Sequence, residues 1–290
     1  MGIAHNISIK MGGKQMGVRT KIRTVKRRIS LRIISAIQAM IYKNKSKAKL
    51  EKFLSQFRKH YVSCDLIRIG GDNDGGYLLP NILDDISYCF SPGVAQLADF
   101  EKELSEKFKI KSFMADASVD NPPLSDENFE FIPKFLGSLT SGEFITLSDW
   151  LNQSEMSLNK NMILQMDIEG GEYDVLVYED SEVLKSFSIM VIEFHNLHKL
   201  FREDFLRMVS AIFEKIYKNF SICHVHINNV CYIETLGGIE VPPVIEVSFI
   251  RNDLIDKVLS EKPISLPHNL DSRNVLYERD TVMPEIWWKS

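Results

Sequence analysis

The sequence predicts an α/β fold built around a mostly parallel β-sheet. Short apolar runs typical of buried strands alternate with stretches whose apolar residues recur every three or four positions, the spacing of a helix face. Strands that alternate with helices in this way are joined by crossovers, which make the strands parallel. The chain has 290 residues, 44% of them hydrophobic and 26% charged, which is enough apolar material for one large domain or two small ones. Disordered, collagen-like and small disulfide-rich classes are therefore excluded.

The first predicted elements begin after about residue 66. Ile86–Ser91 is a short apolar run and predicts a buried strand. The apolar residues of Asp99–Phe108 recur every four positions and predict a helix, and Lys111–Ala115 predicts the next strand. Two further segments continue the succession, Phe129–Leu136 and then Phe144–Asn152, which contains a short helix around a tryptophan.

The second half shows the same succession more clearly. Asn161–Met166 predicts a strand, Glu172–Tyr178 the beginning of a helix, and Ile189–Phe194 a strand with almost no polar position. Arg202–Phe220 predicts a long helix, because its apolar residues fall on one side. Three closely spaced strands follow and allow an antiparallel edge: Ser221–Ile227, Cys231–Thr235 and Val244–Ile250.

The cysteines indicate the redox environment. Cys64, Cys89, Cys223 and Cys231 form no CxxC pair, and three of them lie in apolar runs that predict strands. We therefore expect reduced, buried thiols and a cytosolic compartment, where disulfides are rare.

Charge is distributed unevenly along the chain. Residues 1–50 contain thirteen Lys or Arg and no Asp or Glu, which leaves 22 basic and 39 acidic residues in the other 240. Residues 1–28 have few large apolar side chains and are expected to be mobile. From Ile29, isoleucines four apart predict an amphipathic helix, which Arg32 makes too polar to cross a bilayer. No small-residue cleavage site follows, so export is not expected.

Two interpretations of this basic N-terminal arm are open. Its residues 21–28 can lie on anionic lipid while the apolar face enters the interface, each basic group contributing about 1 kcal/mol. Alternatively, the arm is a solvated tail followed by a helix that packs on the acidic body. Nucleic acid is not expected as a partner, because the acidic body repels phosphate and aromatic residues do not interleave with basic ones.

Candidate binding residues follow the first two strands, at the sheet edge where open parallel sheets bind ligands. Ser91 and Gly93 begin the turn after the first strand, and Gly93 lets a ligand approach the backbone; an ordinary strand-to-helix turn explains it equally well. Asp116 ends the second strand, where a carboxylate can accept hydrogen bonds from both hydroxyls of a ribose. A helix cap or a solvated acid is the alternative.

Three carboxylates crowd the end of the strand Asn161–Met166: Asp167, Glu169 and Glu172. This crowding is costly unless a sulfonium, a metal ion or an array of hydrogen-bond donors lies nearby. Gly170–Gly171 permit a sharp turn into the next helix, whose positive end favours an acidic residue. The alternative is that Glu169 and Glu172 only cap that helix.

Four of the seven histidines gather near the ends of two later strands: His195, His198, His224 and His226. Asp167, His195 and His226 are therefore candidate ligands of a divalent ion such as Mg²⁺ or Mn²⁺, or a general base with its orienting partner. A histidine in a strand is also commonly a satisfied core residue.

A glycine-rich loop precedes the first strand. In RIGGDNDGGYLLP (68–80), four glycines surround two aspartates, so the backbone either folds over a ligand or makes successive turns. Asp72, Asp74, Gly75 and Tyr77 are the candidate ligand contacts. A calcium loop is excluded, because regularly spaced oxygen ligands and a final Glu are absent.

Together these segments resemble the FkbM-type S-adenosylmethionine-dependent methyltransferases. The resemblance covers roughly residues 66–250, and DIEGGE is its most specific element. The turn SPGVAQ departs from the usual methyltransferase pattern, because it lacks the multi-glycine loop. The segments that carry the resemblance are RIGGDNDGGYLLP (68–80), CFSPGVAQLADFEKEL (89–104), LQMDIEGGEYDVL (164–176) and VIEFHNLH (191–198), with weaker support from HVHINN (224–229).

This resemblance implies a Rossmann-like, seven-stranded, mostly parallel sheet with helices on both faces, an S-adenosylmethionine donor, and O-methylation of a sugar or polyketide hydroxyl. By position, Ser91 and Gly93 would line the methionine and ribose, and Asp116 would hold the ribose hydroxyls. Asp167 would lie beside the donor, and the DGGY loop would close over the site.

We add a hypothesis of catalytic roles for Asp167, Glu169 and His195. A sulfonium methyl group is already electrophilic, so the protein must align the acceptor oxygen and remove its proton. Either His195 is the base, or Asp167 and the histidines hold a metal ion that lowers the pKa of the hydroxyl.

The sequence thus predicts a basic N-terminal arm with a helix at residues 1–60, a methyltransferase domain at 61–252, and a C-terminal extension packed on that domain at 253–290, where Trp287 and Trp288 fill a surface groove. The expected acceptor is a saccharide or lipid-linked glycan of a surface polysaccharide, met in the cytoplasm or at the inner face of the membrane. The alternatives are a metal-dependent hydrolase that uses the Asp, Glu and His cluster, and a non-catalytic, membrane-associated partner in glycan assembly.

Overall fold

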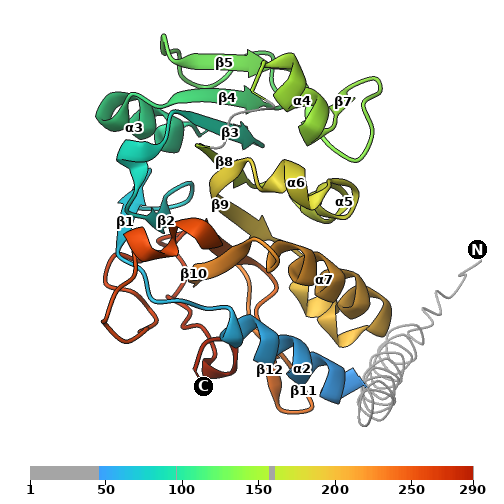
Figure 1. Ribbon diagram of the computed structural model, residues 1–290. Helices are drawn as coiled ribbons and strands as arrows, with labels where there is room; N and C mark the ends of the chain where they lie inside the picture. Colours follow the sequence, from blue (N-terminus) through green and yellow to red (C-terminus); the bar gives the residue numbers. More distant parts are fainter. Residues whose placement is uncertain (1–45, 96, 157–160, 290) are drawn as a thin grey trace, which may run out of the picture.

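A seven-stranded sheet is the centre of the computed structural model, which describes residues 46–95, 97–156 and 161–289 (Figure 1). The strand order is β10-β13-β9-β8-β3-β4-β5, and β13 runs in the direction opposite to the other six strands. The predicted α/β fold with a seven-stranded, mostly parallel sheet is confirmed. The strands are β3 (Tyr88–Pro92), β4 (Lys111–Ala115), β5 (Phe129–Ile132), β8 (Met162–Met166), β9 (Phe187–Phe194), β10 (Phe220–Ile227) and β13 (Ile245–Arg251).

Each face of the sheet has its own core, because successive side chains of a strand point to opposite faces. Leu164 and Met190 belong to the core under α2, α4, α5, α6 and α7, whereas Ile163 and Ile189 belong to the core under α3. The second face is shared with a hairpin of β1 (Leu66–Ile69) and β2 (Tyr77–Pro80), which the sequence analysis did not predict. The helices are α2 (Ser46–Lys59), α3 (Asp99–Phe108), α4 (Leu147–Gln153), α5 (Glu172–Tyr178), α6 (Ser181–Leu184) and α7 (Glu203–Ile216).

Local sequence explains where several of these elements begin and end. The α3 helix has the predicted bounds, with Phe100 and Leu104 buried against the sheet and Lys109 ending it in the left-handed region at φ 58°. Thr146 caps α4 by accepting a hydrogen bond from the backbone N–H of Asp149. The α7 helix is shorter than predicted, because residues 217–219 form a turn into β10.

The predicted antiparallel edge forms from two of the three last strands. β13 pairs antiparallel with the edge strand β10 and lies between it and β9. The predicted strand Cys231–Thr235 is wrong: β11 (Glu234–Leu236) pairs with β12 (Ile239–Val241) in a separate hairpin. The reason is the turn at residues 237–238, two glycines with positive φ that fix a two-residue hairpin. Another small pair joins β6 (Phe135–Leu136) to β7 (Phe144–Ile145).

Segments from both ends of the described chain pack onto the sheet. α2 buries Phe53 and Phe57, whose rings contact the fully buried Trp287 at centroid distances of 6.3 and 5.3 Å. Beyond α2, Tyr61 forms a bridge with Ile222 and so covers part of the outer edge of β10. The predicted helix that starts at residue 29 lies outside the described residues, and the division into three regions stays a prediction.

The four cysteines are free. Cys89 and Cys223 are buried in strands, whereas Cys64 and Cys231 are half-buried, so the expectation of buried thiols is right for two of the four. Cys231 lies in the loop between β10 and β11. Within the described ranges, no helix has both the length and the apolar surface needed to cross a bilayer.

Candidate active site at the carboxyl edge of the sheet

A cavity of about 850 Å³ lies where the strand order reverses, beyond the ends of β3 and β8. The chain leaves β3 towards β4 and β5 and then returns on the other side of β3 with β8 and β9. Ligands of open α/β sheets bind at such a reversal. Seven predicted site residues line the cavity: Asp74, Gly75, Tyr77, Gly93, Asp116, Asp167 and Glu169. Asp72, Ser91, His195 and His226 are not in this lining.

Gly93 is required by the contact between the turn after β3 and the end of β8. Its φ is +89°, and a Cβ at this position would lie less than 3.0 Å from the carbonyl oxygen of Asp167. Both the dihedral and the close approach exclude a side chain. The fold therefore requires a glycine at position 93 even when no ligand is bound. This packing requirement could not be seen in the sequence.

Asp116 ties together the two loops at the ends of β3 and β4. Its Oδ2 accepts a hydrogen bond from the Ala95 N–H at 2.9 Å, and its Oδ1 accepts from the N–H and the hydroxyl of Ser118 at 2.7 and 2.6 Å. A carboxylate has about four acceptor positions, so three are already filled. Asp116 can accept from both hydroxyls of a ribose only when one of these donors, such as the Ser118 hydroxyl, turns away.

Ser91 is not part of the cavity lining. Its hydrogen-bond partner Glu101 does line the cavity. The Ser91 hydroxyl is fully buried and lies within hydrogen-bond distance of the Glu101 carboxylate and of Gln165 Oε1. Burial raises the pKa of Glu101 from 4.5 to about 7, although the Ser91 hydrogen bond opposes the shift. Sequence reasoning missed Glu101 because an acid in the first turn of a helix is common.

This carboxyl makes stability depend on pH. Because the folded pKa of Glu101 is above its unfolded value, the folded state binds more protons between pH 4.5 and 7. We expect the free energy of unfolding to fall as pH rises through this window, by on the order of 3 kcal/mol for one such group. Urea unfolding at pH 5 and pH 8 should show a smaller decline for Glu101→Gln than for wild type. Glu106→Gln, exposed on the same helix, is the control and should behave as wild type; an unchanged decline in Glu101→Gln would contradict this assignment.

His195 and three carboxylates form a cluster at the ends of β8 and β9. The His195 Nε2 atom lies 3.8 Å from Asp167 Oδ1, 3.5 Å from Glu169 Oε2 and 3.5 Å from Glu193 Oε1. The backbone N–H of His195 donates to Glu172 Oε1 at 2.7 Å, which fixes the start of the turn after β9. Asp167 and His195 therefore lie close together, as the sequence predicted. Glu193, which was not predicted, belongs to the same cluster.

Burial controls the protonation of this cluster. It raises the pKa of Asp167 to about 7, with the charge of His195 opposing the shift and that of Glu169 adding to it. Burial also raises the pKa of Glu193, and the nearby Asp167 raises it further. For His195, burial lowers the pKa, but the hydrogen bond and charge of Glu172 and the other carboxylates outweigh it, so the net shift is upward.

The family comparison matches the part of the chain that carries this cluster. Residues 142–219 match the methyltransferase FkbM domain. The match contains LQMDIEGGEYDVL and VIEFHNLH, so the resemblance inferred from the sequence is confirmed for these two segments. Among solved structures, the chain is similar to the crystal structure of M. jannaschii TYW2 in complex with AdoMet, with 13% identity and a TM-score of 0.29 over 58% of this chain and 73% of that chain. The comparison with curated proteins finds no match.

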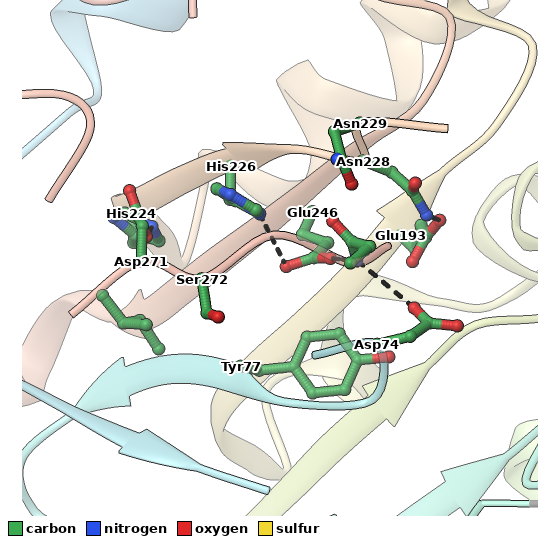
Figure 2. A network of polar contacts seen from close by, with 12 residues as sticks. Asp74, Tyr77, Glu193, His224, His226, Asn228, Asn229, Glu246, Asp271 and Ser272 are labelled. Carbon is green, nitrogen blue, oxygen red and sulfur yellow. Dashed lines mark hydrogen bonds and ion pairs between the residues drawn. The ribbon is translucent and has the colours of Figure 1, made fainter. Parts of the chain in front are cut away.

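His226 lies outside the matched FkbM region and belongs to a neighbouring polar group. Its Nδ1 is 3.5 Å from Glu246 Oε2, and Figure 2 shows His226, Glu246 and Glu193 on neighbouring strands. The Asn274 side chain donates to Glu246 at 2.6 Å and to Asp74 at 3.2 Å. The structure therefore places His226 with Glu246, whereas Asp167 and His195 lie with Glu193.

The glycine-rich loop lines part of the cavity through Asp74, Gly75 and Tyr77 and is held by two sets of hydrogen bonds. The Arg68 guanidinium donates to the Gly71 carbonyl at 3.1 and 3.0 Å, which closes the loop on itself. From the C-terminal segment, the Ser272 hydroxyl donates to the Asp72 carbonyl. Asp72 thus has a structural contact outside the cavity lining, while Tyr77 lines the cavity and accepts a hydrogen bond from Gln165 at 3.2 Å.

Proposed function

We propose that this protein is an S-adenosylmethionine-dependent O-methyltransferase that acts on a saccharide hydroxyl. The observation that carries the proposal is the FkbM match over residues 142–219, because β8 of that stretch leads into the cavity and β9 leads into the acidic cluster beside it. The methyltransferase activity is supported by the family, and the saccharide acceptor is our extension of it.

The cavity suits the donor in size and chemistry. Its volume of about 850 Å³ is within the usual range of small-molecule sites. Leu97, Phe135 and Phe144 offer partly exposed apolar surface for the adenine, and Asp116 offers a carboxylate for the ribose. Asp167 lines the cavity, and a positively charged sulfur beside it would favour the ionised form of its carboxyl.

The protein's part in the reaction is alignment and proton removal. When bound, S-adenosylmethionine supplies an electrophilic methyl group on a positively charged sulfur. The acceptor hydroxyl loses its proton as its oxygen forms the new bond to carbon. Asp167 and Glu169 face the cavity where this oxygen must lie, and His195 is next to them. Either His195 takes the proton, or the cluster holds an ion that acidifies the hydroxyl.

The glycan acceptor and the location are proposed from charge. An arm with thirteen basic residues in its first 50 would keep the enzyme near anionic lipid, where lipid-linked glycans are assembled. We accordingly place the enzyme in the cytoplasm or at the inner face of the membrane. Incubation with isotopically labelled donor and a panel of saccharides tests the acceptor, and an arm-deleted variant tests the role of the arm.

Donor binding is the first test. S-adenosylmethionine should raise the melting temperature, since a ligand of the folded state adds about 2.7 kcal/mol at a hundred times its Kd. Asp116→Asn should weaken binding by about 10–100-fold, the value of a hydrogen bond to a charged group. Asp120→Asn, exposed in the loop after β4, is the matched control and should bind as wild type. Absence of any shift in wild type would sink the proposal and favour the hydrolase.

A further inference from the structure

Two carboxylates at the ends of β8 and β9 each have a buried oxygen without a hydrogen-bond partner among the described residues. These atoms are Asp167 Oδ1 and Glu193 Oε2. The Glu193 side chain is 3% exposed, so water does not satisfy it freely. Buried polar groups in folded proteins almost always have a partner. Unpaired oxygens on these two carboxylates, which both lie next to His195 Nε2, therefore indicate a ligand of the cluster.

The spacing of these side chains identifies the kind of ligand. Each offers one oxygen or nitrogen, and the three atoms lie within 4.8 Å of one another. The His195 Nε2 atom is 3.8 Å from Asp167 Oδ1 and 3.5 Å from Glu193 Oε1, which is too long for hydrogen bonds. Ligands about 2.0–2.3 Å from one ion are separated by distances of this size.

The surroundings are those of a cation site. Glu246 lies opposite Glu193 in the register of β13 with β9, and Glu169 Oε2 lies 3.5 Å from His195 Nε2, so acidic side chains predominate around the three residues. Glu193 Oε1 accepts a hydrogen bond from the Asn228 side chain at 3.0 Å, which fixes its orientation (Figure 2). Hydrogen bonds behind the ligands commonly set the geometry of metal sites.

We propose that Asp167, Glu193 and His195 hold one divalent cation at the inner wall of the cavity. Two carboxylates and one imidazole suit Mn²⁺ or Mg²⁺. His195 is absent from the cavity lining whereas Asp167 belongs to it, so a cation held by both would connect the imidazole to an acceptor in the cavity. The ligand set differs from the one predicted from the sequence, with Glu193 in place of His226.

The role of the ion, unlike its binding, rests on the proposed methyl transfer. The acceptor hydroxyl oxygen would coordinate the cation, which lowers the pKa of that hydroxyl. Its O–H bond breaks, the proton passes to solvent, and the electron pair stays on the oxygen that accepts the methyl group.

Binding of Mn²⁺ alone to the full-length protein tests the site without donor or acceptor. Loss of the free-ion electron paramagnetic resonance signal should give one Mn²⁺ per chain. Glu193→Gln and Asp167→Asn should each weaken binding by at least about tenfold, since even changes behind metal ligands cost about 10–100-fold. His226→Gln is the matched control and should bind as wild type. Circular dichroism confirms folding, and if Glu193→Gln does not fold, Asp167→Asn carries the comparison.

Two results overturn the proposal: wild type that binds no Mn²⁺ at millimolar concentration, or wild-type affinity in both Glu193→Gln and Asp167→Asn. Loss of binding in His226→Gln with Glu193→Gln unaffected overturns this ligand set. The donor-induced melting shift of wild type is measured in parallel. A donor-induced melting shift without Mn²⁺ binding contradicts the cation site but not the proposed function. Mn²⁺ binding without a melting shift contradicts the proposed function but not the cation site.

Discussion

Gly93→Ala is expected to lower the melting temperature by roughly 5–15 °C and to abolish donor binding. An alanine here combines the left-handed backbone cost of about 1–2 kcal/mol with an overlap that costs about 1–3 kcal/mol or more. The overlap is with the Asp167 carbonyl oxygen, a backbone atom that cannot move aside without displacing the end of β8. Differential scanning calorimetry with and without S-adenosylmethionine measures both effects.

Gly238→Ala separates the two contributions. Gly238 has a similar φ, +80°, but a Cβ there meets nothing within 4 Å. The Gly238→Ala variant should therefore lose only the backbone contribution to the free energy of unfolding, about 1–2 kcal/mol, and should bind the donor as wild type does. Equal losses of stability in the two variants would show that the contact between Gly93 and β8 contributes little.

His195→Ala is expected to lower kcat by about 10²–10⁴-fold, the usual contribution of a positioned proton-transfer group. The loss follows whether His195 is the base or a cation ligand, because both roles act on the same hydroxyl. Turnover of labelled donor with a productive saccharide measures it, and dependence of wild-type turnover on Mn²⁺ distinguishes the two roles. His198→Ala, three residues further along, is the control, since His198 is outside both the cavity and the cluster. Full turnover of His195→Ala would exclude both roles.

The sequence predicted best what depends on local periodicity and on the direction of strands. Asp99–Phe108 and Lys111–Ala115 have the predicted bounds, because one has a helical apolar face and the other is a short apolar run. Asp116 and Asp167 line one cavity because both follow parallel strands, whose carboxyl ends share an edge of the sheet.

Other features depend on contacts between distant segments and could not be predicted in this way. Glu193 is one acid in an apolar run, and its role depends on the register that aligns β9 with β8 and β13. The hairpin β1–β2 was missed because its four-residue strands flank a glycine-rich loop that itself suggested only turns. Glu101 was missed because its importance follows from burial beside Ser91, which the helix pattern does not show.

The position of β13 within the sheet has a consequence for synthesis of the protein. β9 and β10 are made first, but they have no ladder with each other and are joined only through residues 245–251. During synthesis, therefore, β9 has one unpaired edge until residues 245–251 have left the ribosome. A nascent chain released before that point would expose two unpaired edges, which are templates for self-association.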